Sequence, residues 1–273
     1  MRSFFMKNPS LDFSKHSVSK RTGRLERFKE KRVCIKKGKR KIVIEHMIKD
    51  SRGIWIVIAI LGSTIGFLIH FSCLKWFSNR NRGKPMQKNL WNRKCSAFVV
   101  SIIFLSVIGK DGLCFSTVRY LGLACILFAI SLIDSISYQI PNRFLVIGIL
   151  WWFVTLPFTK DSIVEKGVLG LFGAFFIGGG ILFLSLFLDH KLQRESIGGG
   201  DVKLFCLLGF YFGMELGMLH LIISCIMGIL FVLFLKKERI PFAPAISISA
   251  WIVVLFGKEI LNFYWSFLGS LVM

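Results

Sequence analysis

Residues 53–77 read GIWIVIAILGSTIGFLIHFSCLKWF, and Lys75 is the only charged residue among them. At a rise of about 1.5 Å per residue, a helix of this length covers the hydrocarbon core of a bilayer, which is about 30 Å thick. The stretch therefore predicts a transmembrane helix, and it decides the fold class of the chain.

Further apolar runs follow along the rest of the chain, which has 273 residues and is 54% apolar. This composition is typical of a membrane protein. We predict an all-α, polytopic membrane domain over residues 53–273 with about eight transmembrane helices and with its core motifs within residues 131–257. The further runs lie at residues 96–109, 113–133, 143–158, 167–188, 202–214, 216–235, 242–257 and 259–272.

Basic charge is concentrated in two places, the first fifty residues and the segment Lys75–Lys94, and Lys and Arg outnumber Asp and Glu by 36 to 15. Such charge suits an anionic membrane surface. Nucleic-acid binding is not predicted, because the chain leaves little room for a folded soluble body. The seven cysteines include no Cys-x-x-Cys pair and the five histidines are scattered, so neither a metal site nor a disulfide framework is predicted.

Residues 1–52 alternate short apolar pieces with basic clusters and show no sustained period. We interpret them as a disordered or membrane-surface tail. If the segment Lys75–Lys94 is cytoplasmic, successive crossings bring Asp134 and Asp201 to that same face. The tail would then lie on the opposite side. Three hypotheses resolve this conflict: the tail is translocated, the first span is re-entrant, or translation starts at Met47. We favour the last, which native peptides from upstream of Met47 would exclude.

Two aspartates stand at the edges of apolar runs, where an ionisable residue is costly and is functional by default. Asp134 ends one run and is followed by Ser-Ile-Ser-Tyr-Gln-Ile and then by Pro141 and Asn142. A purely structural alternative is a helix cap near Pro141. Asp201 follows three glycines, which permit unusual backbone conformations and close approach of another chain. Its structural alternative is a carboxylate at a helix N-terminus.

Together the two carboxyl groups indicate more than either does alone. Two carboxyls that share a proton hydrolyse a peptide bond when the ionised one activates water and the neutral one protonates the substrate. Gly-x-Ser-x-Gly and P-loop strings are absent from the sequence. Asp134 and Asp201 are therefore predicted to be the catalytic pair of an aspartic peptidase.

In four pieces the sequence resembles the type IV prepilin peptidases, membrane-embedded aspartic peptidases with a Gly-x-Gly-Asp signature. The spacing of Asp134 from Pro141-Asn142 and the string GGGDVKL at 198–204 are specific in combination. A Pro-Phe-x-Pro string at 241–244 that opens a span is moderately specific, and GSTIGFLIH at 62–70 is weak. The resemblance covers about residues 53–257.

The resemblance implies a multi-pass protein of the inner membrane that removes a short basic leader from prepilins or pseudopilins at the cytoplasmic face, just before an apolar helical segment. Asp134 and Asp201 would be catalytic, without a cofactor or metal, and the partners would be prepilins and membrane lipid. Lys203 would occupy the family's basic position, with a snorkelling lysine as the alternative. The remaining matched positions would shape loops or bind substrate: Gly198, Gly199, Gly200, Pro141 and Asn142.

The chain also departs from the family pattern. Many members carry an insert with paired Cys-x-x-Cys motifs after the first span, where this chain has a short basic loop. Many also methylate the new N-terminus with S-adenosylmethionine, which would be a cofactor here only if that activity is retained. Asn142 stands where an acidic residue is frequent, so one fewer carboxylate is available to assist.

Two other classes of function remain open from the sequence. A proton-coupled transporter also uses carboxylates in its spans, although such sites usually lie near the membrane midplane. An inactive factor in pilus or secretion assembly would keep the fold without the chemistry.

Overall fold

The structure is a computed structural model that describes residues 52–80, 93–158, 162–193, 197–235 and 240–272. The chain divides into two units, Met1–Ile54 and Trp55–Met273, and the account below concerns the second. Of the predicted tail, only Arg52 belongs to the described residues, so the predictions made for the tail lie outside them.

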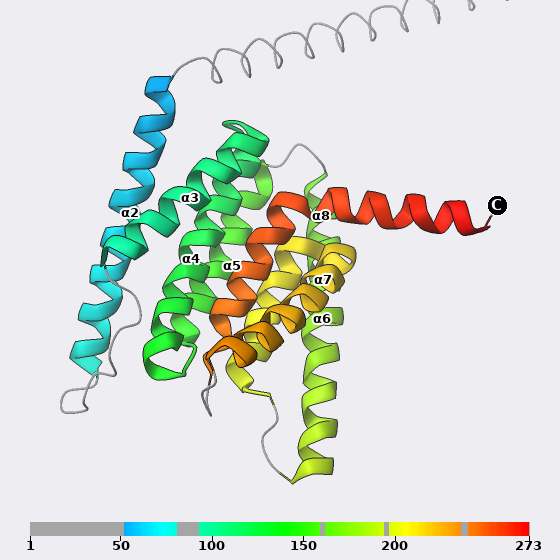
Figure 1. Cartoon of the computed structure of the whole chain (residues 1–273). Coiled ribbons are helices and arrows are strands. Elements are labelled where there is room, and N and C mark those ends of the chain that lie inside the picture. The colour runs from blue at the N-terminus through cyan, green and yellow to red at the C-terminus, as the bar shows by residue number, and fades with distance from the viewer. Residues whose placement is uncertain (1–51, 81–92, 159–161, 194–196, 236–239, 273) are drawn as a thin grey trace, which may run out of the picture. The chain divides into compact units, whose positions relative to one another are not determined.

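Every element in the described part of the chain is helical, which confirms the prediction of an all-α, polytopic membrane protein (Figure 1). Among the helices of the described residues, five are long and apolar enough to cross a membrane, namely α2, α4, α6, α7 and α8. The predicted number of about eight spans stays a prediction. The elements are α2 Arg52–Arg80, α3 Arg93–Asp111, α4 Phe115–Ser137, α5 Asn142–Thr155, η1 Leu156–Phe158, α6 Ile163–Leu192, α7 Gly199–Leu235 and α8 Ala243–Val272.

Helix α7 reverses direction at Gly213, where φ is 69° and ψ is −163°. A positive φ of this kind is readily accessible to glycine. Before the break, Cys206 packs against Gly178 of α6. After it, Gly217 packs against Ile177, which is next to Gly178, so the chain has turned back along α6. The two halves of α7 are therefore the separate apolar runs expected at residues 202–214 and 216–235.

Helix α8 is continuous, although its sequence favoured two runs interrupted at Lys258. Lysine is a good helix former, so a single charge does not end a helix. Beside it, Glu259 forms an ion pair with Lys110 of α3 at 3.0 Å.

The hydrophobic core joins α4, α5, α6, α7 and α8. Among helices surrounded by lipid, van der Waals packing of these side chains stabilises the contacts between the inner faces of the helices. The most buried members of the core include Leu123, Ile130, Trp152, Leu204, Leu207 and Ile246.

Candidate active site

Asp134 lies in the last turn of α4, and its residue is only 5% exposed. The helix ends at Ser137 because Tyr138 adopts a left-handed conformation and donates its N–H to the carbonyl oxygen of Asp134 at 2.8 Å. Burial of a carboxyl group is costly unless it has hydrogen-bond partners.

The partner of the Asp134 carboxylate is the start of α8. The backbone N–H of Ala243 donates to Oδ2 at 3.0 Å. The first N–H groups of a helix have no partner within the helix, and its dipole favours an anion there. The alternative in which Asp134 caps a helix near Pro141 is wrong, because its carboxylate binds the start of α8 instead.

Asp201 lies in the first turn of α7 and is half-buried. The helix begins where the carbonyl oxygen of Gly198 accepts the N–H groups of Asp201 and Val202, at 2.9 and 3.3 Å. A Cβ atom at Gly198 would lie 3.1 Å from Oδ2 of Asp201, so bare backbone borders the carboxylate. Glycine at this position leaves one side of the carboxyl group open.

The structure brings Asp134 and Asp201 within electrostatic range of each other, although they are 67 positions apart in the sequence. Close packing beside them holds the two helix ends together. A Cβ atom at Gly200 would lie 3.0 Å from Cβ of Ile140, in the turn between α4 and α5, whereas one at Gly199 would meet nothing within 4 Å. Gly200 therefore allows the start of α7 to approach the end of α4.

Lys203 and Asn142 also come together, and both are exposed. The Lys203 Nζ donates to Oδ1 of Asn142 at 3.2 Å, which links the first turn of α7 to the first residue of α5. Pro141 is the N-cap residue of α5, with an extended backbone. All the predicted site residues therefore lie at the end of α4, the start of α5 or the start of α7.

The sequence did not reveal the role of α8 at this site. The Pro-Phe-x-Pro string at 241–244 was singled out by resemblance alone, and nothing in it indicated that its backbone would bind Asp134. Backbone N–H groups carry no residue-specific signal, so the sequence could not predict this contact.

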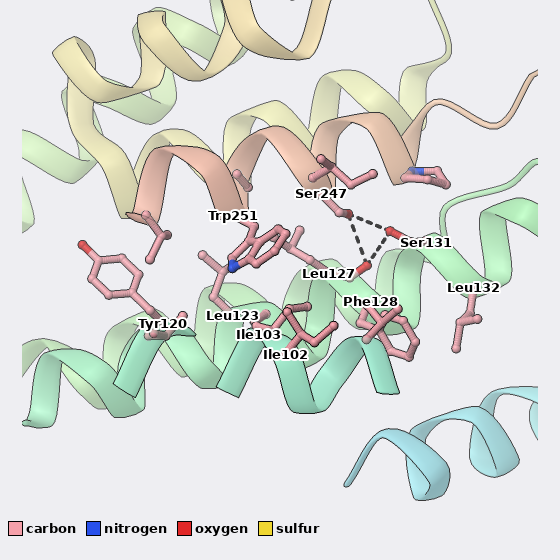
Figure 2. Close-up of a pocket in the computed structure, with 17 residues that line it drawn as sticks. Ile102, Ile103, Tyr120, Leu123, Leu127, Phe128, Ser131, Leu132, Ser247 and Trp251 are labelled. Atoms are coloured by element: carbon pink, nitrogen blue, oxygen red, sulfur yellow. Dashed lines mark hydrogen bonds between the residues drawn. The ribbon is translucent and has the colours of Figure 1, made fainter. Parts of the chain in front are cut away.

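An apolar groove lies between α3, α4 and α8, and it encloses about 300 Å³ (Figure 2). We call it the α3–α4–α8 groove. Ser131 and Ser247 are at one end, joined by a hydrogen bond of 2.7 Å, and Tyr120 is at the other. Its walls include Ile102, Leu123, Leu127, Phe128, Ile248 and Trp251.

The membrane-spanning helices make this a polytopic membrane protein. The helix ends that carry the two carboxyl groups form a candidate aspartic site. Residues 121–233, which contain both aspartates, match the model of the type IV leader peptidase family. Over this region the chain is similar to members of that family.

Several proteins named prepilin leader peptidase/N-methyltransferase are similar to this chain. The one from Bacillus subtilis (strain 168) is 31% identical over 150 residues, which cover 51% of this chain and 56% of that protein. The one from Pseudomonas aeruginosa is 33% identical over 153 residues, which cover 52% and 51%. The one from Xanthomonas campestris pv. campestris is 25% identical over 218 residues, which cover 72% and 73%.

The chain spans about half the length of the first two relatives. No solved structure matches it significantly.

Proposed function

We propose that this protein is a membrane aspartic endopeptidase that removes the leader from prepilins or pseudopilins at the cytoplasmic face. The observation that carries the proposal is the pairing of Asp134 and Asp201 from distant segments within the region that matches the family model. The named activity of the relatives supports the choice of substrate.

In this mechanism the two carboxyl groups divide the work. Like charges at close range resist being ionised together, so one group carries the proton while the other is an anion. The anion activates a water molecule, and the neutral group protonates the leaving amine. The hydrogen bond from Ala243 orients Asp134, and the bare backbone at Gly198 leaves room beside Asp201 for an extended peptide.

Charge at the helix ends supports the cytoplasmic orientation. Arg143, Lys191 and Lys203 are exposed near the ends of the helices that carry or flank the two aspartates. Basic residues near span ends favour the cytoplasmic side. The basic leader of a prepilin would then stay outside the hydrocarbon while its peptide bond reaches the carboxyls.

Co-expression with a candidate prepilin tests the proposal. Leader removal is scored by gel shift and by N-terminal sequencing of the product. A product that begins just before the apolar segment supports the proposal. Uptake of a solute into vesicles without any cleavage would instead support a proton-coupled transporter, and full complementation of a deletion by the Asp134→Asn and Asp201→Asn variants would support an inactive assembly factor.

Gly200→Ala is expected to slow leader removal by about tenfold, since small misplacements of catalytic groups have effects of this order or larger. The new Cβ would press on Ile140, whose Cβ lies 3.0 Å away, and would shift the start of α7 from Asp134. Gly199→Ala is the matched control, because its Cβ meets nothing within 4 Å. Initial rates in membranes that contain equal amounts of each variant measure the effect. Equal rates for the two variants would refute the role given to Gly200.

Lys203→Ala is expected to slow leader removal only partly. The side chain is exposed and its hydrogen bond to Asn142 joins two helix starts without touching either carboxyl in the structure. A contact of this kind contributes about 0.5–1.5 kcal/mol, which corresponds to a change in rate of about 2- to 13-fold. Asn142→Ala should cause a similar loss, and the double variant should lose little more. Complete loss on Lys203→Ala would assign the lysine a direct role in the reaction.

Methylation of the new N-terminus is a separate proposal. The α3–α4–α8 groove does not fit S-adenosylmethionine, whose charged and adenine groups need polar partners, because nearly all of its lining is apolar. We therefore assign no residue of the described segments to this cofactor. Transfer of a labelled methyl group to the processed pilin is the measurement that tests the activity.

A further inference from the structure

The α3–α4–α8 groove begins beside the candidate catalytic pair. Ser131 precedes Asp134 by one helical turn, so the two side chains lie on neighbouring parts of one face of α4. On α8, Pro244 lines the groove and directly follows Ala243, whose N–H holds the Asp134 carboxylate. The groove is therefore continuous with the site where a peptide bond would be cut.

From that end the groove extends inward along the membrane-spanning part of α4. Its lining runs from Ser131 to Tyr120, and eleven residues of helix correspond to about 16 Å. Figure 2 shows Trp251 of α8 and Ile102 of α3 facing this part of α4. An occupant that reaches Asp134 along the groove comes from within the bilayer.

The chemistry of the lining selects an apolar occupant, because the lining is almost entirely apolar and the polar groups of Ser131, Ser247 and Trp251 already have partners. The Ser131 and Ser247 hydroxyls lie 2.7 Å apart, and each has a carbonyl oxygen as a further acceptor at 2.8 Å, that of Leu127 for Ser131 and that of Ala243 for Ser247. The indole N–H of Trp251 donates to Ser106 at 3.0 Å. A volume of about 300 Å³ is sufficient for a few large side chains, and it lies at the lower end of the range for ligand pockets.

We propose that the groove binds the apolar side chains that follow the scissile bond of the substrate, an inference that rests on the proposed function. A basic leader cannot enter an apolar groove within the membrane without a large desolvation cost. The apolar segment that follows the scissile bond meets no such cost. When this segment lies in the groove, the backbone that precedes it reaches Asp134 and the leader remains at the membrane surface.

A lipid acyl chain has the same apolar chemistry, but continuity with Asp134 favours the peptide. The backbone of a peptide bound in the groove can continue past Ser131 and Pro244 to the two carboxyl groups, whereas an acyl chain has no such backbone. The substrate's side chains would thereby set both the depth of insertion and the bond that is presented for cleavage. The groove would act as a specificity site for large apolar residues.

Photo-cross-linking to the full chain tests this inference. The probe is a synthetic peptide with a basic leader, an apolar helical segment and a photoreactive leucine in that segment next to the junction. The protein carries Asp201→Asn so that the peptide stays intact. Mass spectrometry then maps the attachment sites, which we expect on Ile102, Leu132 or Ile248.

Ala124→Phe fills the groove ten residues from Asp134 and leaves the carboxyls in place. We expect it to lower the cross-linking yield by about tenfold, the scale on which one methylene changes recognition in an apolar pocket. Ile248→Trp fills the groove from α8, and it tests the same point if Ala124→Phe accumulates poorly. Val146→Phe is the control, because Val146 is 54% exposed on α5 and does not line the groove.

Attachment to the outer faces of α5 or α6, or equal yields with the filled and control variants, would overturn the inference. So would labelling of the groove by a photoreactive phospholipid that the peptide does not displace. If the wild-type chain cleaves prepilin while the peptide attaches elsewhere, the groove inference fails and the proposed function stands. Peptide attachment in the groove of a chain that cleaves no prepilin would support the groove and contradict the proposed function.

Discussion

Asp201→Asn and Asp134→Asn are each expected to abolish leader removal, with a loss of at least about 10²–10⁴-fold in rate. An amide neither exchanges the proton nor activates water as a carboxyl pair does. The two groups lie within electrostatic range of each other, so each variant breaks the same pair. Gel shift of a co-expressed prepilin measures the rate.

Asp111→Asn provides the matched control, because Asp111 ends α3, before the start of α4, and Asp134 lies near the end of α4. Asp134 lies nineteen positions after Phe115 in the helix, which corresponds to about 28 Å. We expect normal processing by this variant. Processing at the wild-type rate by Asp134→Asn or Asp201→Asn, at equal protein abundance, would remove the aspartic mechanism.

Gly173→Ala is expected to destabilise the protein by about 1–3 kcal/mol or more, the usual cost of overpacking. A Cβ atom at Gly173 would come within 2.5 Å of backbone atoms of both Gly209 and Gly213. Backbone cannot rotate away as a flexible side chain can, so α6 and α7 must separate. Thermal unfolding of the purified protein in detergent, together with its abundance in membranes, measures the effect.

Gly180→Ala on the same helix is the control. Its Cβ would meet nothing within 4 Å, and alanine is the better helix former by about 1 kcal/mol in water. This variant should keep the wild-type melting temperature or exceed it slightly. Equal melting temperatures for the two variants would show that close packing at Gly173 does not hold α6 against α7.

The lengths of the apolar runs and the positions of the charged residues between them predicted the helices well, because a segment in lipid must satisfy its backbone hydrogen bonds internally. The sequence also indicated Asp134 and Asp201 as a pair, since ionisable residues at the ends of apolar runs are rare and costly. The structure places the two groups within electrostatic range of each other. Their catalytic role stays a prediction.

Contacts between distant helices were beyond the sequence. The hydrogen bond from Ala243 to Asp134 uses a backbone group that every residue except proline carries, so no residue type marked it. The reversal at Gly213 was expected only as a gap between two apolar runs, since many glycines in such runs serve packing instead. The continuity of α8 through Lys258 was missed because hydropathy records charge and ignores helix propensity.

The hydrogen bond between Ala243 and Asp134 has a consequence for how the enzyme would turn over. A water molecule or peptide that takes Oδ2 for itself leaves a buried amide without an acceptor, at a cost of about 1–3 kcal/mol. The incoming molecule must replace that bond or move the first turn of α8. Helix α8 also forms one wall of the groove. Binding of water or peptide at the Asp134 carboxylate and binding of the substrate in the groove would therefore be thermodynamically linked, each changing the affinity of the other.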